Sequence, residues 1–178
     1  MITLQEKYRK EVIPAMQREF GYRNPMAVPR IEKVVLNTGV GRLREEKQLD
    51  YVGRVLSLIT GQKPAARTAK KAIAAFKTRR GLVVGYQVTL RGRRMWEFLE
   101  RLIAIAIPRQ RDFRGIDPRS FDGRGNLTLG FREYIVFPEL AGEDIPFLFG
   151  LEVTVVTTAR RREEGIALLK LLGVPIKP

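Results

Sequence analysis

Hydrophobic and polar residues alternate along several short segments of the chain, and each such segment predicts a β-strand. The segments are rich in β-branched residues, and most are bounded by glycine, proline or a charged residue. They cover residues 31–38, 83–91, 127–130, 132–137 and 151–158. Antiparallel strands with one buried face show this alternation, so we expect a mostly antiparallel sheet.

Other segments repeat their apolar residues every three or four positions, which predicts helices. The clearest is 93–107, which ends at Pro108, and a second runs over 46–60 and ends at Gly61. A third helix is expected over 161–172. The first helix of the chain begins at Thr3, where Thr3 and Glu6 fit a capping box, and runs toward Phe20, with Pro14 either kinking or restarting it. The chain, residues 1–178, is therefore expected to form a single α+β domain with helices on one face of the sheet.

Two strands predict a polar sheet face, because alternate residues of a strand point to the same side. In the first strand Val34 and Leu36 share one side, whereas Lys33 and Asn37 share the other. In the second, the same alternation separates Tyr86, Val88 and Leu90 from Gln87, Thr89 and Arg91. We expect the apolar side to pack on helices and the polar side to face outward. An ordinary solvent-facing sheet would show the same alternation.

The composition points to a polyanionic partner. The chain has 33 lysines and arginines against 19 aspartates and glutamates, a formal net charge of +14. Nucleic acid is the first expectation for such a charge and an anionic membrane surface the second. No apolar run approaches the ~20 residues of a membrane span, and we expect no membrane association. The absence of histidine and cysteine excludes thiolate or imidazole zinc sites and removes the usual general base.

The positive charge is concentrated in the middle of the chain. No acidic residue lies between Asp50 and Glu97, a span that contains eleven lysines and arginines. Within it, residues 63–81 are rich in alanine and small residues and are expected to form a flexible basic loop. Phe76 lies among its cations, where the ring would stack on a base; as an alternative, Phe76 anchors the loop in the core.

Two weaker patterns are better explained by turns than by chemistry. Gly39 and Gly41 follow a strand, but no glycine–lysine–serine or –threonine sequence completes a phosphate-binding loop. Asp112, Asp117 and Asp122 have the spacing and neighbours of turn residues rather than of metal ligands. We therefore expect no metal and no other cofactor.

Longer stretches of the chain resemble one family. The chain resembles the bacterial large-subunit ribosomal protein five family, which binds 5S ribosomal RNA in the central protuberance, and the similarity runs through essentially its whole length. The matching stretches are 26–41, 68–77, 88–92, 108–115, 121–126 and 155–159.

The resemblance implies a non-enzymatic, cytoplasmic ribosomal protein whose sheet surface holds 5S ribosomal RNA. Its implied contacts are Lys33, Asn37, Gln62, Thr89 and Arg91; we add Gln87 from the strand face and Lys63 from the basic segment. The resemblance further implies that the loop at about 69–81 faces the peptidyl-site transfer RNA. The residues expected there are Lys70, Lys71, Phe76, Lys77, Arg79 and Arg80.

The implied partners also include the large-subunit ribosomal RNA, other large-subunit proteins and a head protein of the small subunit across the subunit interface. Two alternatives remain at this point. One is an RNA-modifying or RNA-cleaving enzyme that uses a carboxylate pair, although no pair has convincing spacing. The other is a chaperone or surface-binding basic protein without RNA specificity.

Overall fold

The computed structural model of the chain describes residues 2–43, 45–76, 78–111 and 113–177. Its five strands form one sheet in the order β2-β3-β1-β5-β4, and every neighbouring pair is antiparallel. The strands are β1 (Ile31–Gly39), β2 (Ala65–Thr68), β3 (Val83–Leu90), β4 (Leu127–Phe131) and β5 (Leu151–Thr157). The predicted α+β class with an antiparallel sheet is confirmed.

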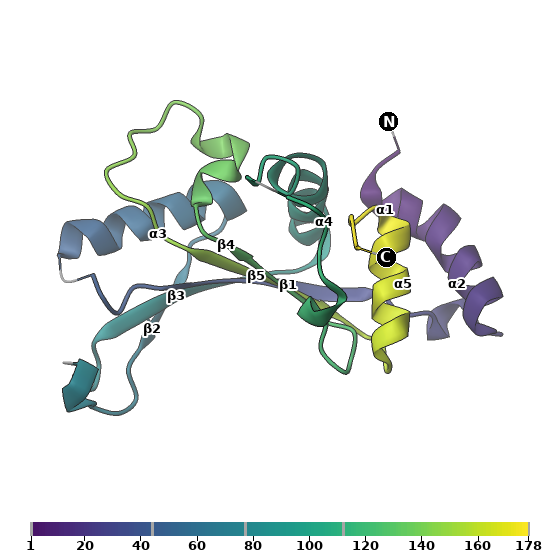
Figure 1. Cartoon of the computed structure of the whole chain (residues 1–178), viewed down its shortest axis with the longest axis horizontal. Coiled ribbons are helices and arrows are strands. Elements are labelled where there is room, and N and C mark those ends of the chain that lie inside the picture. The colour runs from purple at the N-terminus through teal and green to yellow at the C-terminus, as the bar shows by residue number, and fades with distance from the viewer. Residues whose placement is uncertain (1, 44, 77, 112, 178) are drawn as a thin grey trace.

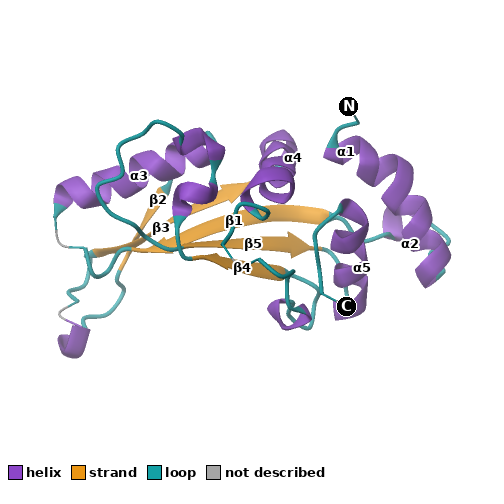
Figure 2. Ribbon diagram, turned by 45° about the horizontal axis from the view of Figure 1, so that its top comes forward, coloured by secondary structure: helices purple, strands orange, loops and turns teal. Residues whose placement is uncertain are grey.

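The helices fall into two groups around this sheet. Figure 1 shows α3 and α4 over the same face of the sheet, and α1, α2 and α5 together at one end; Figure 2 shows the same arrangement after a turn. The helices are α1 (Leu4–Lys7), α2 (Ile13–Phe20), α3 (Glu46–Thr60), α4 (Gly92–Arg101) and α5 (Arg162–Leu172). A π-helical turn at Tyr8–Val12 joins α1 to α2, and a second one at Leu102–Ala106 continues α4.

The first helical segment follows its sequence closely. The Glu6 N–H donates to Thr3 Oγ1 at 3.3 Å and the Thr3 N–H donates to Glu6 Oε2 at 3.2 Å, so the predicted capping box is present. The π-helical turn comes directly before Ile13 and Pro14. Proline has no N–H to donate, so the regular ladder of α-helical hydrogen bonds is interrupted here. The helix ends at Gly21, which has a φ of 72°.

One part of the core lies between the sheet and α3 and α4, and buried residues of α1, α2 and α5 continue it at the end of the molecule where these helices lie. In β1 the buried residues are Ile31, Val34, Leu36 and Thr38, and the last three pair with Leu90, Val88 and Tyr86 of β3. Phe137, in the segment after β4, packs into this part of the core. The centroid of its ring lies 5.9 Å from that of Phe98 of α4, on which it stacks, and 5.7 Å from that of Phe131. Aromatic pairs at these centroid distances add to the free energy gained by burial.

The predicted strand at 132–137 is wrong. That segment instead contains a 3₁₀ turn at Tyr134–Val136, followed by a second one at Pro138–Leu140. Tyr134 and Phe137 are both fully buried. Residues three apart share a side in a helical turn but not in a strand, so burial of both rings requires the turn.

The predicted loop at 63–81 is also partly wrong, because Ala65–Thr68 forms the edge strand β2. Alanine is depleted in strands, and all four residues are exposed. The strand exists because its backbone pairs with β3, from Ala65 opposite Gln87 to Thr68 opposite Val83. A contact of this kind leaves no hydrophobic signal in the sequence.

The loop before β4 packs unusually closely on α5. A Cβ built on Gly165 of α5 would lie 2.3 Å from the Gly125 carbonyl oxygen and 2.4 Å from Gly125 Cα. These distances are shorter than any real contact of a Cβ atom, so the two backbones meet only because both residues are glycine. Thr157 Oγ1 also donates to the Gly125 carbonyl at 3.1 Å.

Asp122 holds that loop in its turn, as predicted for a turn aspartate. Its Oδ1 accepts from the N–H groups of Arg124 at 2.8 Å and Asn126 at 2.9 Å, and its Oδ2 accepts from Asn126 Nδ2 at 2.7 Å. Asp117 likewise accepts from the Arg119 N–H, whereas Asp112 lies outside the described residues. Desolvation raises the pKa of Asp122, but the hydrogen bonds from Asn126 and Arg124 outweigh it and lower the pKa overall.

The Asp122→Asn variant is expected to lose about 1 kcal/mol of stability at pH 7, because an amide nitrogen cannot accept the bond from Asn126 Nδ2. A carboxyl whose pKa is lowered by folding stabilises the protein above its unfolded pKa, near 3.8, and this contribution is lost as the pH falls through the folded pKa. The difference between wild type and variant should therefore shrink on acidification below about pH 4. Urea unfolding at pH 7 and pH 3 measures it, and an equal difference at both would contradict the assignment.

Candidate nucleic-acid interface

The sheet has an open face, which we define as its strand residues that point away from α3 and α4. On β1 these are Lys33, Val35 and Asn37, and all three are partly or fully exposed. Gln87 and Thr89 of β3 pair with Asn37 and Val35 and therefore lie on the same side. The predicted division of β1 and β3 into an apolar and a polar side is confirmed.

The register arranges the open face into rows that cross the strands. One row, here called the amide row, contains Gln87, Asn37 and Glu152 on three neighbouring strands, with Gly130 of β4 at its end. Strands in a sheet lie about 4.8 Å apart, so adjacent side chains in the row are within reach of one molecular group.

The next row offers hydroxyl groups. It runs through Thr89, Val35, Thr154 and Thr128, and the hydroxyls of Thr128 and Thr154 are 3.2 Å apart. The open face thus presents rows of hydrogen-bonding side chains, with Val35 and Val156 among them. This is the kind of surface that contacts backbone and groove edges of a folded RNA.

Cations lie at the margins of the open face. Lys33 Nζ and an Arg91 nitrogen lie 3.8 and 3.6 Å from the same oxygen of Glu32, so two cations share one carboxylate. Arg91 comes directly after β3, at the start of α4, one residue beyond the strand. On the opposite margin, Arg67 of β2 donates from Nε to Gln87 Oε1 at 2.7 Å. The margins therefore keep a net positive charge.

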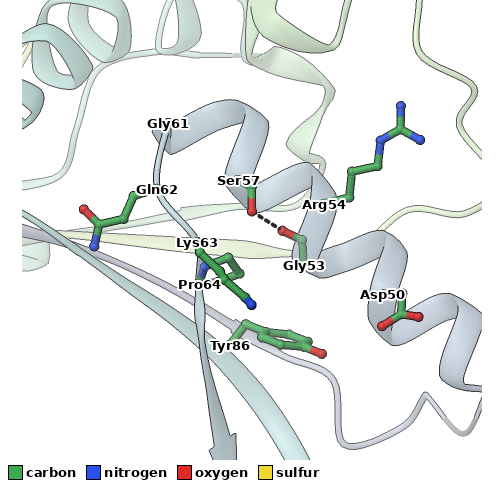
Figure 3. Close-up of a pocket in the computed structure, with 9 residues that line it drawn as sticks. All are labelled: Asp50, Gly53, Arg54, Ser57, Gly61, Gln62, Lys63, Pro64 and Tyr86. Carbon is green, nitrogen blue, oxygen red and sulfur yellow. Dashed lines mark hydrogen bonds between the residues drawn. The ribbon is translucent and has the colours of Figure 1, made fainter.

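Gln62 and Lys63 lie in the connection from α3 to β2. Gln62 donates from Nε2 to the Thr89 carbonyl at 3.3 Å, so it covers the edge of β3 beyond the end of β2. Lys63 instead borders a cavity of about 640 Å³ between α3 and the strands, together with Arg54 and Tyr86 (Figure 3). The structure therefore brings Gln62 to the edge of the open face but does not bring Lys63 onto that face.

The expected basic loop is a hairpin, residues 69–82, that extends from β2 and β3 away from the rest of the sheet (Figure 1). Backbone hydrogen bonds join Ala69 to Leu82 at 2.8 Å, and Ile73 and Thr78 exchange two such bonds at 3.0 and 3.1 Å. A short 3₁₀ turn at Ala74–Phe76 forms its tip. The segment thus has backbone hydrogen bonds across it, including one isolated β-bridge, that composition did not indicate.

Four cations of this hairpin are described by the structure, and none of these has an acidic partner among the described residues. Lys70, Lys71, Arg79 and Arg80 are exposed, and none of them lies within 4 Å of a carboxylate in the part of the chain that the structure describes. Lys77 lies outside the described residues, and for Phe76 only the backbone is described. Both interpretations of the Phe76 ring therefore stay open.

Sequence reasoning missed four residues of this surface: Arg67, Thr128, Glu152 and Thr154. The strands at 127–130 and 151–158 were predicted, so the alternation that places Glu152 and Thr154 on one side was available. The sequence did not show which residues of β1 lie beside Glu152 and Thr154, because strand order and register depend on contacts between residues more than a hundred positions apart.

The described residues offer little for other chemistry. No group of three or more acidic side chains among them is arranged to hold a metal ion. No helix in the described ranges is long and apolar enough to cross a membrane.

Comparisons with known proteins agree with the sequence motifs. The family model described as "Ribosomal protein L5" matches residues 24–79, and a second model, which describes the C-terminus of the same ribosomal family, matches residues 83–176. Together they span the whole open face and its hairpin, apart from the short connection between them.

Curated relatives extend the match to the full chain. The large ribosomal subunit protein uL5 of Rubrobacter xylanophilus is 52% identical over 100% of this chain and 99% of its own length. The proteins of the same name from Dictyoglomus turgidum and from a Roseiflexus species are 53% and 55% identical, and each comparison covers at least 97% of both chains. Identity at this level over the full length leaves one conclusion: the chain belongs to the ribosomal protein L5 family and is a non-enzymatic component of the large ribosomal subunit.

Proposed function

We propose that the open face binds 5S ribosomal RNA and thereby helps to attach it to the large ribosomal subunit. The observation that carries this proposal is the combination of the amide and hydroxyl rows with a positive margin at Lys33, Arg67 and Arg91. The rows supply hydrogen bonds whose spacing is fixed by the sheet. The cations supply attraction to phosphates through release of counterions.

The site residues have different roles in this proposal. Asn37, Gln87 and Thr89 contact the RNA directly, and Lys33 and Arg91 neutralise phosphates at one margin. Gln62 positions the end of β3 through its bond to the Thr89 carbonyl. Lys63 reaches RNA only beside the face, from the cavity next to α3.

The hairpin supports a second contact. Its four exposed cations have no acidic partner among the described residues, and it extends away from the rest of the sheet. We propose that it approaches the peptidyl-site transfer RNA. Contacts with large-subunit ribosomal RNA, with neighbouring large-subunit proteins and with a small-subunit head protein complete the proposed set of partners.

Filter binding with 5S ribosomal RNA tests the first contact. The Thr89→Ala, Arg91→Ala double variant should weaken binding about 10-fold, because it removes a hydrogen bond and a charge from the face. The Lys70→Ala, Lys71→Ala double variant removes two charges from the hairpin and should have a smaller effect. Charge alone would rank the two variants the other way, so the reverse order would show that the open face is not the binding surface.

Salt and competition complete the test. The affinity should fall with ionic strength with a slope of about 0.7–0.9 for each neutralised phosphate in a plot of the two logarithms. An excess of bulk RNA should compete poorly with 5S ribosomal RNA. Equal competition by bulk RNA would indicate a basic protein without specificity and would contradict the proposed function.

A further inference from the structure

The open face has a carboxylate at a position where phosphate binding favours a cation. Glu152 of β5 is exposed and lies in the amide row, with Asn37 on one side and Gly130 on the other. The other carboxylate near this face, Glu32, lies at the margin and pairs with two cations. Glu152 differs from it, because within the described part of the chain it forms no ion pair.

The charge of Glu152 restricts which chemical groups of a bound RNA can contact this part of the open face. An ionised carboxylate accepts hydrogen bonds through both oxygens and donates none, so it attracts N–H groups and repels phosphate oxygens. Its neighbours in the row, Asn37 and Gly130, carry no charge, and neither does Gln87 beyond Asn37, so nothing in the row cancels the charge of Glu152. A phosphate placed here would meet uncompensated repulsion, whereas a base edge that presents N–H donors would be held.

The surroundings of Glu152 leave room for such an edge. Gly130 has no side chain, and a Cβ built there would meet no heavy atom within 4 Å, so one flank of the carboxylate is open. On its other flank, the Asn37 amide offers one acceptor and two donor hydrogens. A carboxylate next to an amide presents a pattern of acceptors and donors that distinguishes one base edge from another.

We propose that Glu152 is a specificity-determining residue that accepts hydrogen bonds from N–H groups on the edge of an RNA base, with Asn37 beside it. This rests on the proposed function, the binding of 5S ribosomal RNA by the open face. The donor is an exocyclic amino group or the paired N1–H and N2–H of guanine. The cations at the margins supply affinity, and the carboxylate in the row supplies selection.

The Glu152→Gln variant tests the proposal, because selection and simple repulsion predict opposite signs. If Glu152 reads a base, the variant binds 5S ribosomal RNA about 10-fold more weakly, while its affinity for bulk RNA stays the same or rises. Glu163→Gln is the matched control: it removes the same charge from an exposed position of α5 and should leave the ratio of the two affinities unchanged. Both affinities are measured by filter binding with the full chain at one salt concentration.

Other outcomes overturn the proposal in distinguishable ways. If Glu152→Gln strengthens binding to both RNAs, the carboxylate only opposes phosphates. If it weakens both alike, its partner is a group that all RNA shares, such as the 2′-hydroxyl. If wild type itself does not prefer 5S ribosomal RNA to bulk RNA, the proposed function fails, and this inference fails with it.

Discussion

The Gly165→Ala variant is expected to lose about 3 kcal/mol of stability, although alanine is the better helix former. Gly165 lies inside α5, where alanine in place of glycine normally stabilises a helix by about 1 kcal/mol. Here the new methyl group would lie 2.3 to 2.7 Å from three backbone atoms of Gly125. Backbone cannot move aside as a flexible side chain can, so either α5 or the loop at 122–126 must shift.

Gly53→Ala is the matched control for this prediction. Gly53 also lies within a helix, α3, but a Cβ there would lie 4.0 Å from Pro64 Cγ, which is an ordinary contact. This variant should gain up to about 1 kcal/mol. Urea unfolding of both variants measures the two effects, and a gain in stability for Gly165→Ala would show that α5 and the loop are not in such close contact.

A loss of about 3–5 kcal/mol is expected for Phe137→Ala. The Phe137 ring is almost fully buried and lies against both Phe98 and Phe131. Its removal would leave a cavity between α4, β4 and the two 3₁₀ turns, whose backbones are held by their own hydrogen bonds. The cost therefore includes the cavity as well as the lost burial.

The neighbouring Ile135 is the control for Phe137. Its side chain is 38% exposed, so Ile135→Ala should cost less than about 1 kcal/mol. Denaturant midpoints and slopes for both variants measure this difference. Similar losses for the two variants would mean that Phe137 is not part of the core and that the interpretation of 132–140 as buried turns is wrong.

Much of the fold could be predicted because it depends on local patterns. The helix at 46–60 was predicted with its observed bounds, and burial in β1 follows the alternation of Lys33, Val34, Val35 and Leu36. The periodicity of a helix and the alternation of a strand depend on residues that are close in the sequence, so both can be recognised without knowing how the rest of the chain folds.

The errors arose where distant contacts decide the structure. Ala65–Thr68 is a strand only because β3 lies beside it, and Tyr134 and Phe137 form a turn only because both rings enter the core. For the candidate interface, the sequence indicated Asn37, Gln87 and Thr89 as one polar side. It did not indicate that Glu152 and Thr154 lie beside them, or that Lys63 lies next to α3, because those placements depend on strand order and chain path.

Strand β3 connects the two proposed RNA contacts. It carries Gln87 and Thr89 on the open face, and its N-terminal end follows directly from the hairpin. From Gln87 to Val83, the first residue of the strand, four steps of extended chain span about 13 Å at about 3.3 Å per residue. If both proposed contacts form, this part of the strand and the hairpin together set the distance between the RNA on the sheet and the RNA at the hairpin tip. Inserting or deleting paired residues at the hairpin base would alter the distance between the two RNAs while leaving the chemistry of each contact intact.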